Sequence, residues 1–322
     1  FLLLPCYTWF YRNTIYANDF VMHFRKDGST MKYDLMFIGP ATRDINIDYT
    51  GQVVEEIGGA VYFCTYAARS AGANVYASVK ISPNDHDILD AFDLDTDHIA
   101  LLPSQKTTLM RNTYFTADRE RRKAECLAQS DSIPLSDIPA IDCKLYHLAG
   151  LLYGDFPLEL LDGLKKRGML SADIQGFLRH NEDGQMNFHD WKVKKEHLSD
   201  FDFLKTDAAE AEILTGTDDR RKAAQILHNW GAKEILISHN QEMLVYDGTQ
   251  FYTCPVKARN LSGRTGRGDT VFGAYLAQRV QNIPIPDALL FATAAVSLKM
   301  ESPGPLRAST AEVCAYRDTF FK

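Results

Sequence analysis

The sequence lacks the features that mark several common classes of protein. Its 322 residues carry 35 Lys and Arg against 42 Asp and Glu, so no basic excess is available to neutralise nucleic-acid phosphates. No apolar run approaches the length that crosses a bilayer, and no internal repeat, low-complexity tract or Pro/Gly-rich linker divides the chain. These absences predict a single domain with an inserted lid, and they argue against nucleic acid and membrane as partners.

Cysteine pairs with metal-binding or redox spacing are also missing. The six cysteines are scattered and none follows the C-x-x-C spacing, so zinc and thioredoxin-type sites find no support. Isolated cysteines in a long chain act as small apolar side chains in a reducing compartment. We therefore expect a cytoplasmic protein.

The first 30 residues differ from the remainder. They mix aromatic residues without a sustained period, whereas a stretch typical of the opening strand of an α/β domain follows directly after Met31. We interpret residues 1–30 as a non-native or disordered extension and residues 31–322 as the folded domain, with Met31 as the natural start.

Short apolar runs alternate with helical patterns along this domain. The runs do not alternate apolar and polar residues, as expected of strands covered on both faces. Six are predicted strands: Leu35–Gly39, Val75–Val79, Leu145–Leu148, Leu170–Ile174, Phe201–Leu204 and Ile235–Ser238. A helix over Arg220–Trp230 ends at Gly231, and another follows Gly58-Gly59. This order predicts an α/β fold with a mostly parallel sheet between layers of helices.

Two stretches are more polar than the predicted core strands but rich in β-forming residues. They span residues 45–57 and 107–115. We interpret them as a small β lid that projects from the main domain, with a surface hairpin without function as the alternative. Because exposed strand edges tend to be covered, the lid offers a surface for a homodimer.

A glycine-rich loop before a predicted helix is the most informative segment. Gly263, Gly266 and Gly268 let the backbone approach a ligand, and the helix start adds partial positive charge, which together suit phosphate. The spacing matches a Walker A motif except that Asp269 stands where lysine belongs. A carboxylate there would repel the phosphates of ATP, a cost that a role in the reaction would offset. Removing a proton from an attacking hydroxyl is such a role. The alternative is a turn with Asp269 as helix N-cap.

This segment, Thr265–Ala274, resembles the C-terminal motif of the PfkB/ribokinase family. The resemblance implies a three-layer ribokinase-like fold, Asp269 as catalytic base, and the backbone of Gly266, Arg267 and Gly268 as the anion hole. Arg267 replaces the alanine of the family motif, and Gly263-Arg264 replaces its leading Asp-Thr, so either arginine is a candidate phosphate contact.

Other segments resemble the family in the expected order. Phe37–Asp44 resembles the first strand and its substrate-binding aspartate, so Asp44 would hold the acceptor hydroxyls, and Gly58 and Gly59 resemble the di-glycine where lid and substrate meet. Lys205–Gly216 resembles the region that organises Mg²⁺ through water, with Asp207 and Glu210 as its carboxylates. The alternative is that Asp207 caps a helix and Glu210 is a solvated charge.

Two further segments resemble the nucleotide side of the family. They place Ser238 and Thr293 with Arg264, Asp207 and Glu210 as cofactor-binding residues, although the glycines of the first segment are replaced by Asn240 and Met243. The resemblance implies ATP and Mg²⁺ as cofactors and leaves a monovalent cation open.

The predicted function is ATP-dependent phosphorylation of a hydroxyl on a small sugar, polyol or nucleoside. Gln175 and Arg179 follow a predicted strand, and Arg111 lies on the lid, so all three are candidate acceptor contacts with Asp44. Two alternatives stay open: a non-catalytic regulator that kept a kinase fold, and a doubly wound oxidoreductase. The missing Gly-x-Gly-x-x-Gly after the first strand argues against the oxidoreductase.

Overall fold

The computed structural model describes residues 33–116 and 121–322. The predicted extension over residues 1–30 lies outside these described residues. Within them, no helix combines the length and apolarity that a membrane span requires, and the cysteines at 64, 126, 143, 254 and 314 are free thiols.

A nine-stranded sheet forms the middle layer, in the order β15-β14-β13-β12-β9-β8-β1-β4-β5. The strands from β13 to β5 run parallel, and β14 and β15 add an antiparallel edge. Their bounds are β1 (Tyr33–Pro40), β4 (Val75–Ile81), β5 (Ile99–Pro103), β8 (Cys143–Leu148), β9 (Met169–Asp173), β12 (Phe203–Asp207), β13 (Glu234–Ser238), β14 (Glu242–Tyr246) and β15 (Phe251–Pro255). All six predicted strands are present, which confirms the α/β prediction.

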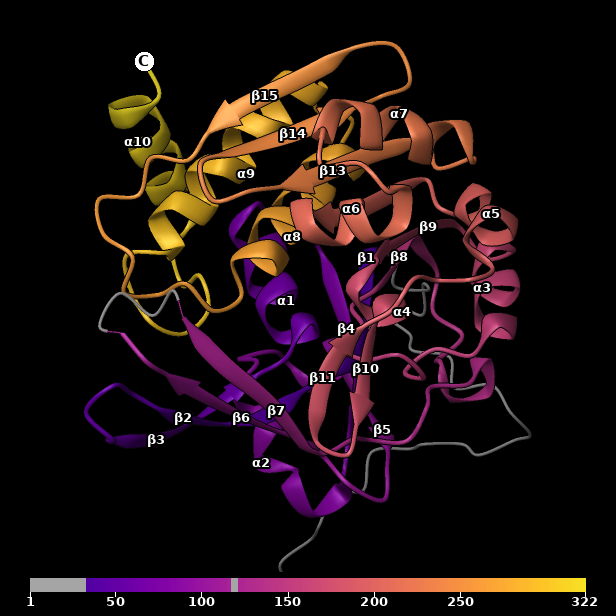
Figure 1. Cartoon of the computed structure of the whole chain (residues 1–322), viewed down its shortest axis with the longest axis vertical. Coiled ribbons are helices and arrows are strands. Elements are labelled where there is room, and N and C mark those ends of the chain that lie inside the picture. Colours follow the sequence, from indigo (N-terminus) through magenta and orange to yellow (C-terminus); the bar gives the residue numbers. More distant parts are fainter. Residues whose placement is uncertain (1–32, 117–120) are drawn as a thin grey trace, which may run out of the picture.

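Helices cover both faces of this sheet, and each face has its own apolar core (Figure 1). In β1, Leu35 and Phe37 pack into one core while Met36 and Ile38 pack into the other, which explains the unbroken apolar run. One core holds α1 (Ala60–Ser70), α8 (Arg267–Val280), α9 (Ile285–Lys299) and α10 (Thr310–Phe320). The other holds α3 (Leu158–Lys165), α6 (Ala208–Thr215) and α7 (Arg220–Asn229).

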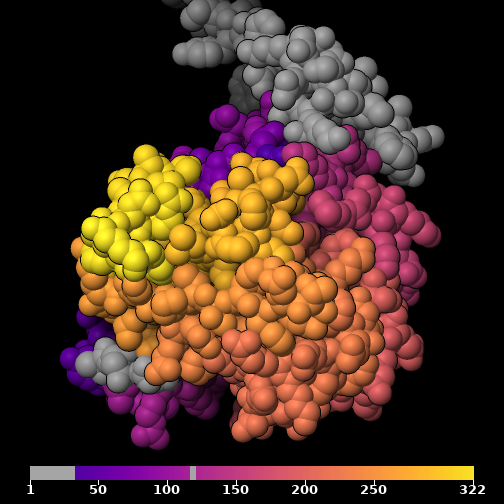
Figure 2. All heavy atoms as spheres, turned by 90° about the horizontal axis from the view of Figure 1, so that it is seen from above, coloured from indigo at the N-terminus to yellow at the C-terminus, as the bar shows by residue number. Residues whose placement is uncertain are grey.

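The short helices α2 (Asp87–Asp90), α4 (Gln175–Leu178) and α5 (Lys194–His197) lie in connecting segments. The face seen in Figure 2 is formed mostly by the C-terminal part of the chain, drawn orange to yellow, where α10 lies beside α9.

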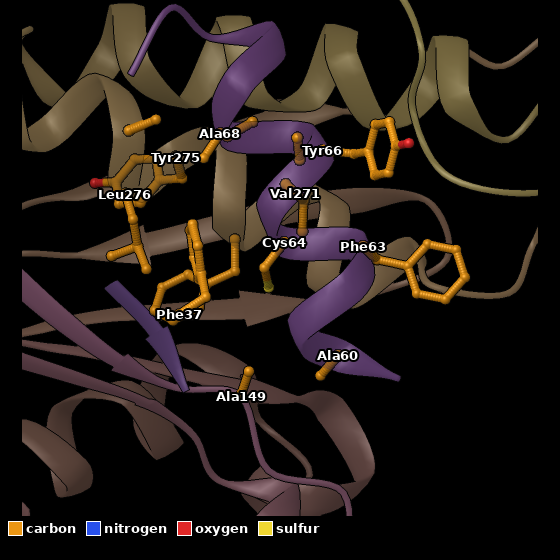
Figure 3. Close-up of a cluster of buried hydrophobic side chains, with 14 of the residues drawn as sticks. Phe37, Ala60, Phe63, Cys64, Tyr66, Ala68, Ala149, Val271, Tyr275 and Leu276 are labelled. Carbon is orange, nitrogen blue, oxygen red and sulfur yellow. The ribbon is translucent and has the colours of Figure 1, made fainter. Parts of the chain in front are cut away.

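Helices α1 and α8 pack unusually close together. A Cβ added at Gly273 of α8 would lie 2.6 Å from the Cys64 carbonyl oxygen of α1, so only glycine allows this approach. Figure 3 shows Cys64 directed toward Phe37 while Phe63 projects from another side of the same helix. The contact brings the start of α8 against Phe63 and so fixes where the glycine-rich loop lies.

A second, six-stranded sheet forms the predicted lid (Figure 1), in the order β10-β11-β7-β6-β2-β3. Its strands are β2 (Thr42–Ile47), β3 (Val53–Gly58), β6 (Thr108–Tyr114), β7 (Arg122–Ala128), β10 (Arg179–Glu182) and β11 (Gln185–Phe188). The predicted stretch 45–57 forms the hairpin of β2 and β3, whereas no pattern in the sequence predicts β7, β10 or β11. Val53 and Val54 lie exposed on the edge strand β3, and pairing with a second copy there stays a prediction.

Candidate active site

A cleft of about 310 Å³ lies between the lid and the carboxyl ends of the parallel strands. Asp207 and Ser238 end the neighbouring strands β12 and β13 and both line it, which is the expected place for a ligand in an α/β sheet. The predicted residues that line the cleft are Asp44, Gly59, Gln175, Arg179, Asp207, Ser238, Arg264, Gly266, Arg267, Gly268 and Asp269. The structure therefore brings most of the predicted site together from distant parts of the sequence.

The glycine-rich loop forms one end of the cleft, which we call the donor end. Gly266 is the N-cap of α8 and adopts the left-handed conformation, with φ of 77°. A Cβ on Gly266 would also lie 2.3 Å from the Phe63 ring, so a side chain is excluded on two grounds. The first turn of α8 then places the backbone amides of Arg267, Gly268 and Asp269 at a positive helix end, where the Arg267 amide donates to the Arg264 carbonyl at 3.3 Å.

Asp269 lies in this first turn and lines the cleft. Loss of water around the carboxylate, reinforced by the negative charge of Asp173, raises the pKa of Asp269 to about 6. Lys205 and Arg179 act in the opposite direction. At neutral pH the side chain is therefore ionised but ready to accept a proton, which is the behaviour of a general base.

A buried ion pair supports the donor end from below, and the sequence analysis missed it. The Lys205 ammonium donates to Asp173 at 2.7 Å, and both side chains are almost fully buried. Burial opposes the charge on Lys205, but Asp173, Glu210 and Asp269 together raise its pKa. A Cβ on Gly268 would lie 3.0 Å from the Lys205 nitrogen, so the glycine-rich loop packs directly against this ammonium group.

The acceptor end of the cleft is centred on Asp44 of β2, which is 7% exposed. The Thr42 hydroxyl donates to its carboxylate at 2.6 Å. Burial raises the pKa of Asp44 to about 6, although Thr42, Arg122 and Arg179 act against that rise. Gly58 does not line the cleft. A Cβ at Gly58 would lie 2.5 Å from the Asp44 carboxylate, so this glycine leaves space for the Asp44 side chain.

A chain of hydrogen-bonded polar side chains lies on the lid strands near Asp44. Asn112 lines the cleft and donates to Asn46 at 3.1 Å, and Asn46 donates to Glu56 at 2.7 Å. This chain of amides orients Asn112, whose remaining capacity suits a hydroxyl. The sequence analysis missed the amides because Asn46 and Asn112 meet only through the parallel pairing of β2 with β6.

Arg179 is the residue that the two ends share. Its side chain is buried, donates to the Leu151 carbonyl at 2.8 Å, and lowers the pKa of both Asp44 and Asp269. Burial in turn lowers the pKa of Arg179 itself. One fixed guanidinium therefore keeps both acids more readily ionised.

Besides Gly58, three predicted residues do not reach the cleft. Arg111 lies on the other side of its strand, 39% exposed, in an ion pair with Glu125. Thr293 is fully buried in α9 and its hydroxyl donates to Leu289 within the helix. Glu210 is buried beneath the cleft. The alternation of side chains along β6 and the helical repeat of α9 determine where Arg111 and Thr293 point. The predicted substrate contact of Arg111, the cofactor contact of Thr293 and the cofactor and metal contacts of Glu210 are therefore corrected.

Asp207 and Glu210 form a capping box at the start of α6. The Glu210 amide donates to Asp207 and the Asp207 amide donates to Glu210, both at 2.8 Å. Burial raises the pKa of Glu210, which favours its neutral form. Within the described part of the chain no group of three or more His, Cys, Asp or Glu side chains gathers as a metal site. Asp207 alone of this pair fits Mg²⁺, which binds through few carboxylates and several waters.

The parallel sheet, the β lid and an acid at the start of a phosphate-type loop define a kinase of the ribokinase fold. A family model described as pfkB family carbohydrate kinase matches residues 143–311. Because this match covers more than half of the chain, the protein belongs to the PfkB family.

Relatives with assigned activities share much of the chain. It is 28% identical to a cytidine kinase of Thermococcus kodakarensis, over 80% of this chain and 92% of that protein. It is 24% identical to an inositol 3-kinase of Arabidopsis thaliana, over 84% of this chain and 74% of that protein.

Among solved structures, one is a pyrophosphate-dependent kinase in the ribokinase family complexed with a pyrophosphate analog and myo-inositol. It is 33% identical, with a TM-score of 0.79, and the match covers 86% of this chain and 99% of that one. A ribokinase of Arabidopsis thaliana complexed with ribose and ATP has a TM-score of 0.68 at 16% identity, over 89% and 99% of the two chains. The second match supports the fold alone.

Proposed function

We propose that this protein transfers a phosphoryl group from a polyphosphate donor to a hydroxyl of a small polyol, with Asp269 as the base. The observation that carries the proposal is the position of Asp269, an acid with a raised pKa in the first turn of α8 beside the loop amides. An acid at an anion site weakens phosphate binding, and a role in the reaction accounts for its presence there despite that cost.

The mechanism follows from the two ends of the cleft. Asp44 accepts hydrogen bonds from acceptor hydroxyls and orients one of them toward the donor loop. Asp269 removes the proton of that hydroxyl as its oxygen attacks the terminal phosphorus of the donor. The bond from this phosphorus to the bridging oxygen breaks, and the rest of the donor leaves with that oxygen and its bonding electrons. The amides of Arg267, Gly268 and Asp269 hold the charge that develops on the transferring group. The Lys205 ammonium stabilises the Asp269 carboxylate until it takes the proton.

A polyol is the acceptor class that the cleft favours. Side chains with hydrogen-bonding groups surround the acceptor end, among them Asp44, Asn112 and Gln175. A nucleoside would add a base that prefers a flat apolar contact. At this end the described lining offers methionines 110 and 186 with Leu151, whereas the rings of Phe63 and Tyr114 lie toward the glycine-rich loop. The structure at 33% identity with myo-inositol adds to this argument.

Mg²⁺ is part of the proposal through Asp207. This carboxylate lines the cleft at the end of β12, next to Ser238, and would hold the ion through water together with the donor phosphates. The ion supplies charge neutralisation to the donor when it is bound. Glu210 holds Asp207 in place rather than the ion.

ATP is the donor that the family resemblance implies, and a specific observation favours inorganic pyrophosphate as the second candidate. Thr293, expected beside the nucleotide, has no exposed surface. The loop before Gly266 is bonded to the end of α9, since the Gly263 amide donates to Met300 and the Ser262 hydroxyl donates to Glu301, each at 2.8 Å. The burial of Thr293 and these loop contacts support a donor without a nucleobase, and the related pyrophosphate-dependent kinase agrees with this.

A matrix of two donors and several acceptors tests the proposal. The purified protein with Mg²⁺ is offered ATP or pyrophosphate, each with myo-inositol, ribose, fructose or cytidine, and phosphorylated products are identified by ³¹P NMR and mass spectrometry. We expect a phosphorylated polyol that is absent with Asp269→Asn. If no pair gives a product while the protein remains folded and binds the donors, the non-catalytic regulator becomes the better account.

A further inference from the structure

Lys299 ends helix α9 directly behind the donor loop and takes no part in the mechanism above. It is one of the largest fully enclosed side chains of the protein, with 2% of its surface exposed. Burying an ammonium costs free energy unless strong partners compensate it. The position of this lysine therefore needs a reason beyond packing.

The partners of Lys299 belong to the donor loop. Its ammonium donates to the Gly263 carbonyl at 2.6 Å and to the Thr265 carbonyl. It also lies 5.2 Å from the centre of the Phe63 ring, over its face. Two inward carbonyls and one aromatic face thus surround a single positive charge.

These two bonds determine where the neighbouring amides point. In a trans peptide the C=O and N–H groups point in opposite directions. When Lys299 holds the Gly263 and Thr265 carbonyls inward, the N–H groups of Arg264 and Gly266 turn away from it, and both of these residues line the cleft. The lysine therefore shapes the loop for an anion.

The charge of Lys299 also reaches the reacting acid. Lys299 lowers the pKa of Asp269, and Asp269 in turn favours the charged lysine, although burial lowers the pKa of Lys299 to about 8. Glu56 of the lid is the other acid that favours the charged lysine. The cation is thus coupled to the donor end without touching the acceptor.

We propose that Lys299 is a built-in cation that replaces a free monovalent metal ion in organising the donor loop. Converging main-chain carbonyls are ligands that suit an alkali ion or an ammonium ion. Here a covalently attached ammonium already holds both carbonyls. A related-fold fructokinase has been solved with potassium bound, whereas the carbonyls bound by Lys299 leave no ligand set for such an ion at this position.

Lys299→Ala tests this inference, which rests on the function proposed above. The variant removes the ammonium and leaves a carbonyl-lined space that K⁺ or NH₄⁺ can enter. In tetramethylammonium buffer we expect its donor KM to rise about tenfold or more with a smaller change in acceptor KM. Added K⁺ or NH₄⁺ restores most of the loss, whereas the wild type responds less than twofold.

Two further variants separate this role from simple packing. Lys257→Ala is the matched control, because Lys257 donates to the Phe320 carbonyl at 2.6 Å and lies 5.2 Å from the Phe321 ring, outside the cleft. Lys299→Met fills the space without charge, so it should lose donor affinity and show no rescue by cations. Small cations should not change the activity of Lys257→Ala.

A binding and stability measurement keeps the test independent of turnover. Calorimetry with pyrophosphate and with ATP should show weaker binding to Lys299→Ala than to wild type. K⁺ should raise the thermal midpoint of Lys299→Ala alone. A wild type that needs K⁺, or a Lys299→Ala variant that binds and turns over the donor normally without cations, overturns the inference. Absent turnover in wild type with cation-dependent stability in the variant rejects the proposed function but keeps the cation site.

Discussion

The donor and acceptor ends of the cleft are built in opposite ways. At the donor end, we propose that backbone amides recognise the phosphates, and the buried ammonium groups of Lys205 and Lys299 lie against the loop that carries them. At the acceptor end, side chains of the lid carry it, with Asp44 held by Thr42 and Asn112 held by Asn46. In the proposed function, donor binding depends mainly on the main chain and the choice of acceptor depends on side chains of the lid, while the Asp269 side chain takes the proton.

This difference explains which departures from the family motif matter. Arg267 replaces an alanine, yet α8 still starts there and its amide still belongs to the first turn, because an amide does not depend on its side chain. Substitutions on β2 or β6 would instead replace the recognising group itself. The ends therefore make different predictions when single side chains are changed.

Asp269→Asn should give the largest effect, because it removes the group that joins the two ends. We expect kcat to fall about 10³-fold or more, since general-base catalysis contributes 10²–10⁴-fold, while both KM values change little. Initial rates with the donor and acceptor that the substrate matrix identifies provide the measurement.

Stability provides the control for Asp269→Asn. Burial raises the pKa of Asp269, so the neutral amide should be accepted at least as well as the ionised carboxylate at pH 8. A thermal midpoint equal to or above that of wild type is expected. Near-normal turnover in a folded variant would remove Asp269 from the base role.

Asp44→Asn should affect the acceptor end alone. We expect acceptor KM to rise about 100-fold, because an unmatched group at a hydroxyl-binding site costs roughly 2–3 kcal/mol, and donor KM to stay within about threefold. Steady-state kinetics with each substrate varied in turn measure both values. A comparable rise in donor KM would show that the two ends are not independent.

The pH dependence should separate the two acids. Asp44 and Asp269 each have a pKa raised to about 6, so both lose their working carboxylate form as the pH falls below that value. If both must be ionised, kcat/KM for the acceptor should fall about 100-fold per pH unit well below pH 6, and about tenfold per unit in Asp44→Asn. An identical slope in the two proteins would contradict a shared requirement.

Sequence reasoning located the donor end more completely than the acceptor end, and the physical reason is range. Gly266, Gly268 and Asp269 lie within four consecutive residues, so a local motif describes them. Asp44 and Asn112 lie on different strands that pair in parallel, and no local pattern predicts that pairing. In the lid, a local excess of β-forming residues predicts the strands near 45–57 and 107–115. The three missed strands of that sheet carry no comparable local pattern.

The two buried lysines show a second limit. Lys205 and Lys299 each sit next to apolar residues in sequence and resemble ordinary strand or helix ends. Lys205 is buried against Asp173, and Lys299 is buried against the Gly263 carbonyl. A buried lysine can be recognised only when its partner is known, so the fold had to come first.

A pair of glycine substitutions should give the smallest effect and test how tightly the donor end is fixed. Gly266 and Gly216 share a left-handed backbone, with φ of 77° and 75°. A Cβ at Gly216 would meet nothing within 4 Å, whereas at Gly266 it would lie 2.3 Å from the Phe63 ring. Gly216→Ala therefore reports backbone strain alone, roughly 1–2 kcal/mol of unfolding free energy.

Gly266→Ala adds the contact with Phe63, and overpacking of a buried ring costs about 1–3 kcal/mol more. Urea unfolding of both variants measures the difference. If the ring yields instead, the two alanine variants will be equally stable, and Gly266→Ala/Phe63→Leu will gain nothing over Gly266→Ala. A rescue by Phe63→Leu of both stability and donor KM would instead show that α1, through one aromatic side chain, holds the anion loop at the spacing that phosphoryl transfer requires.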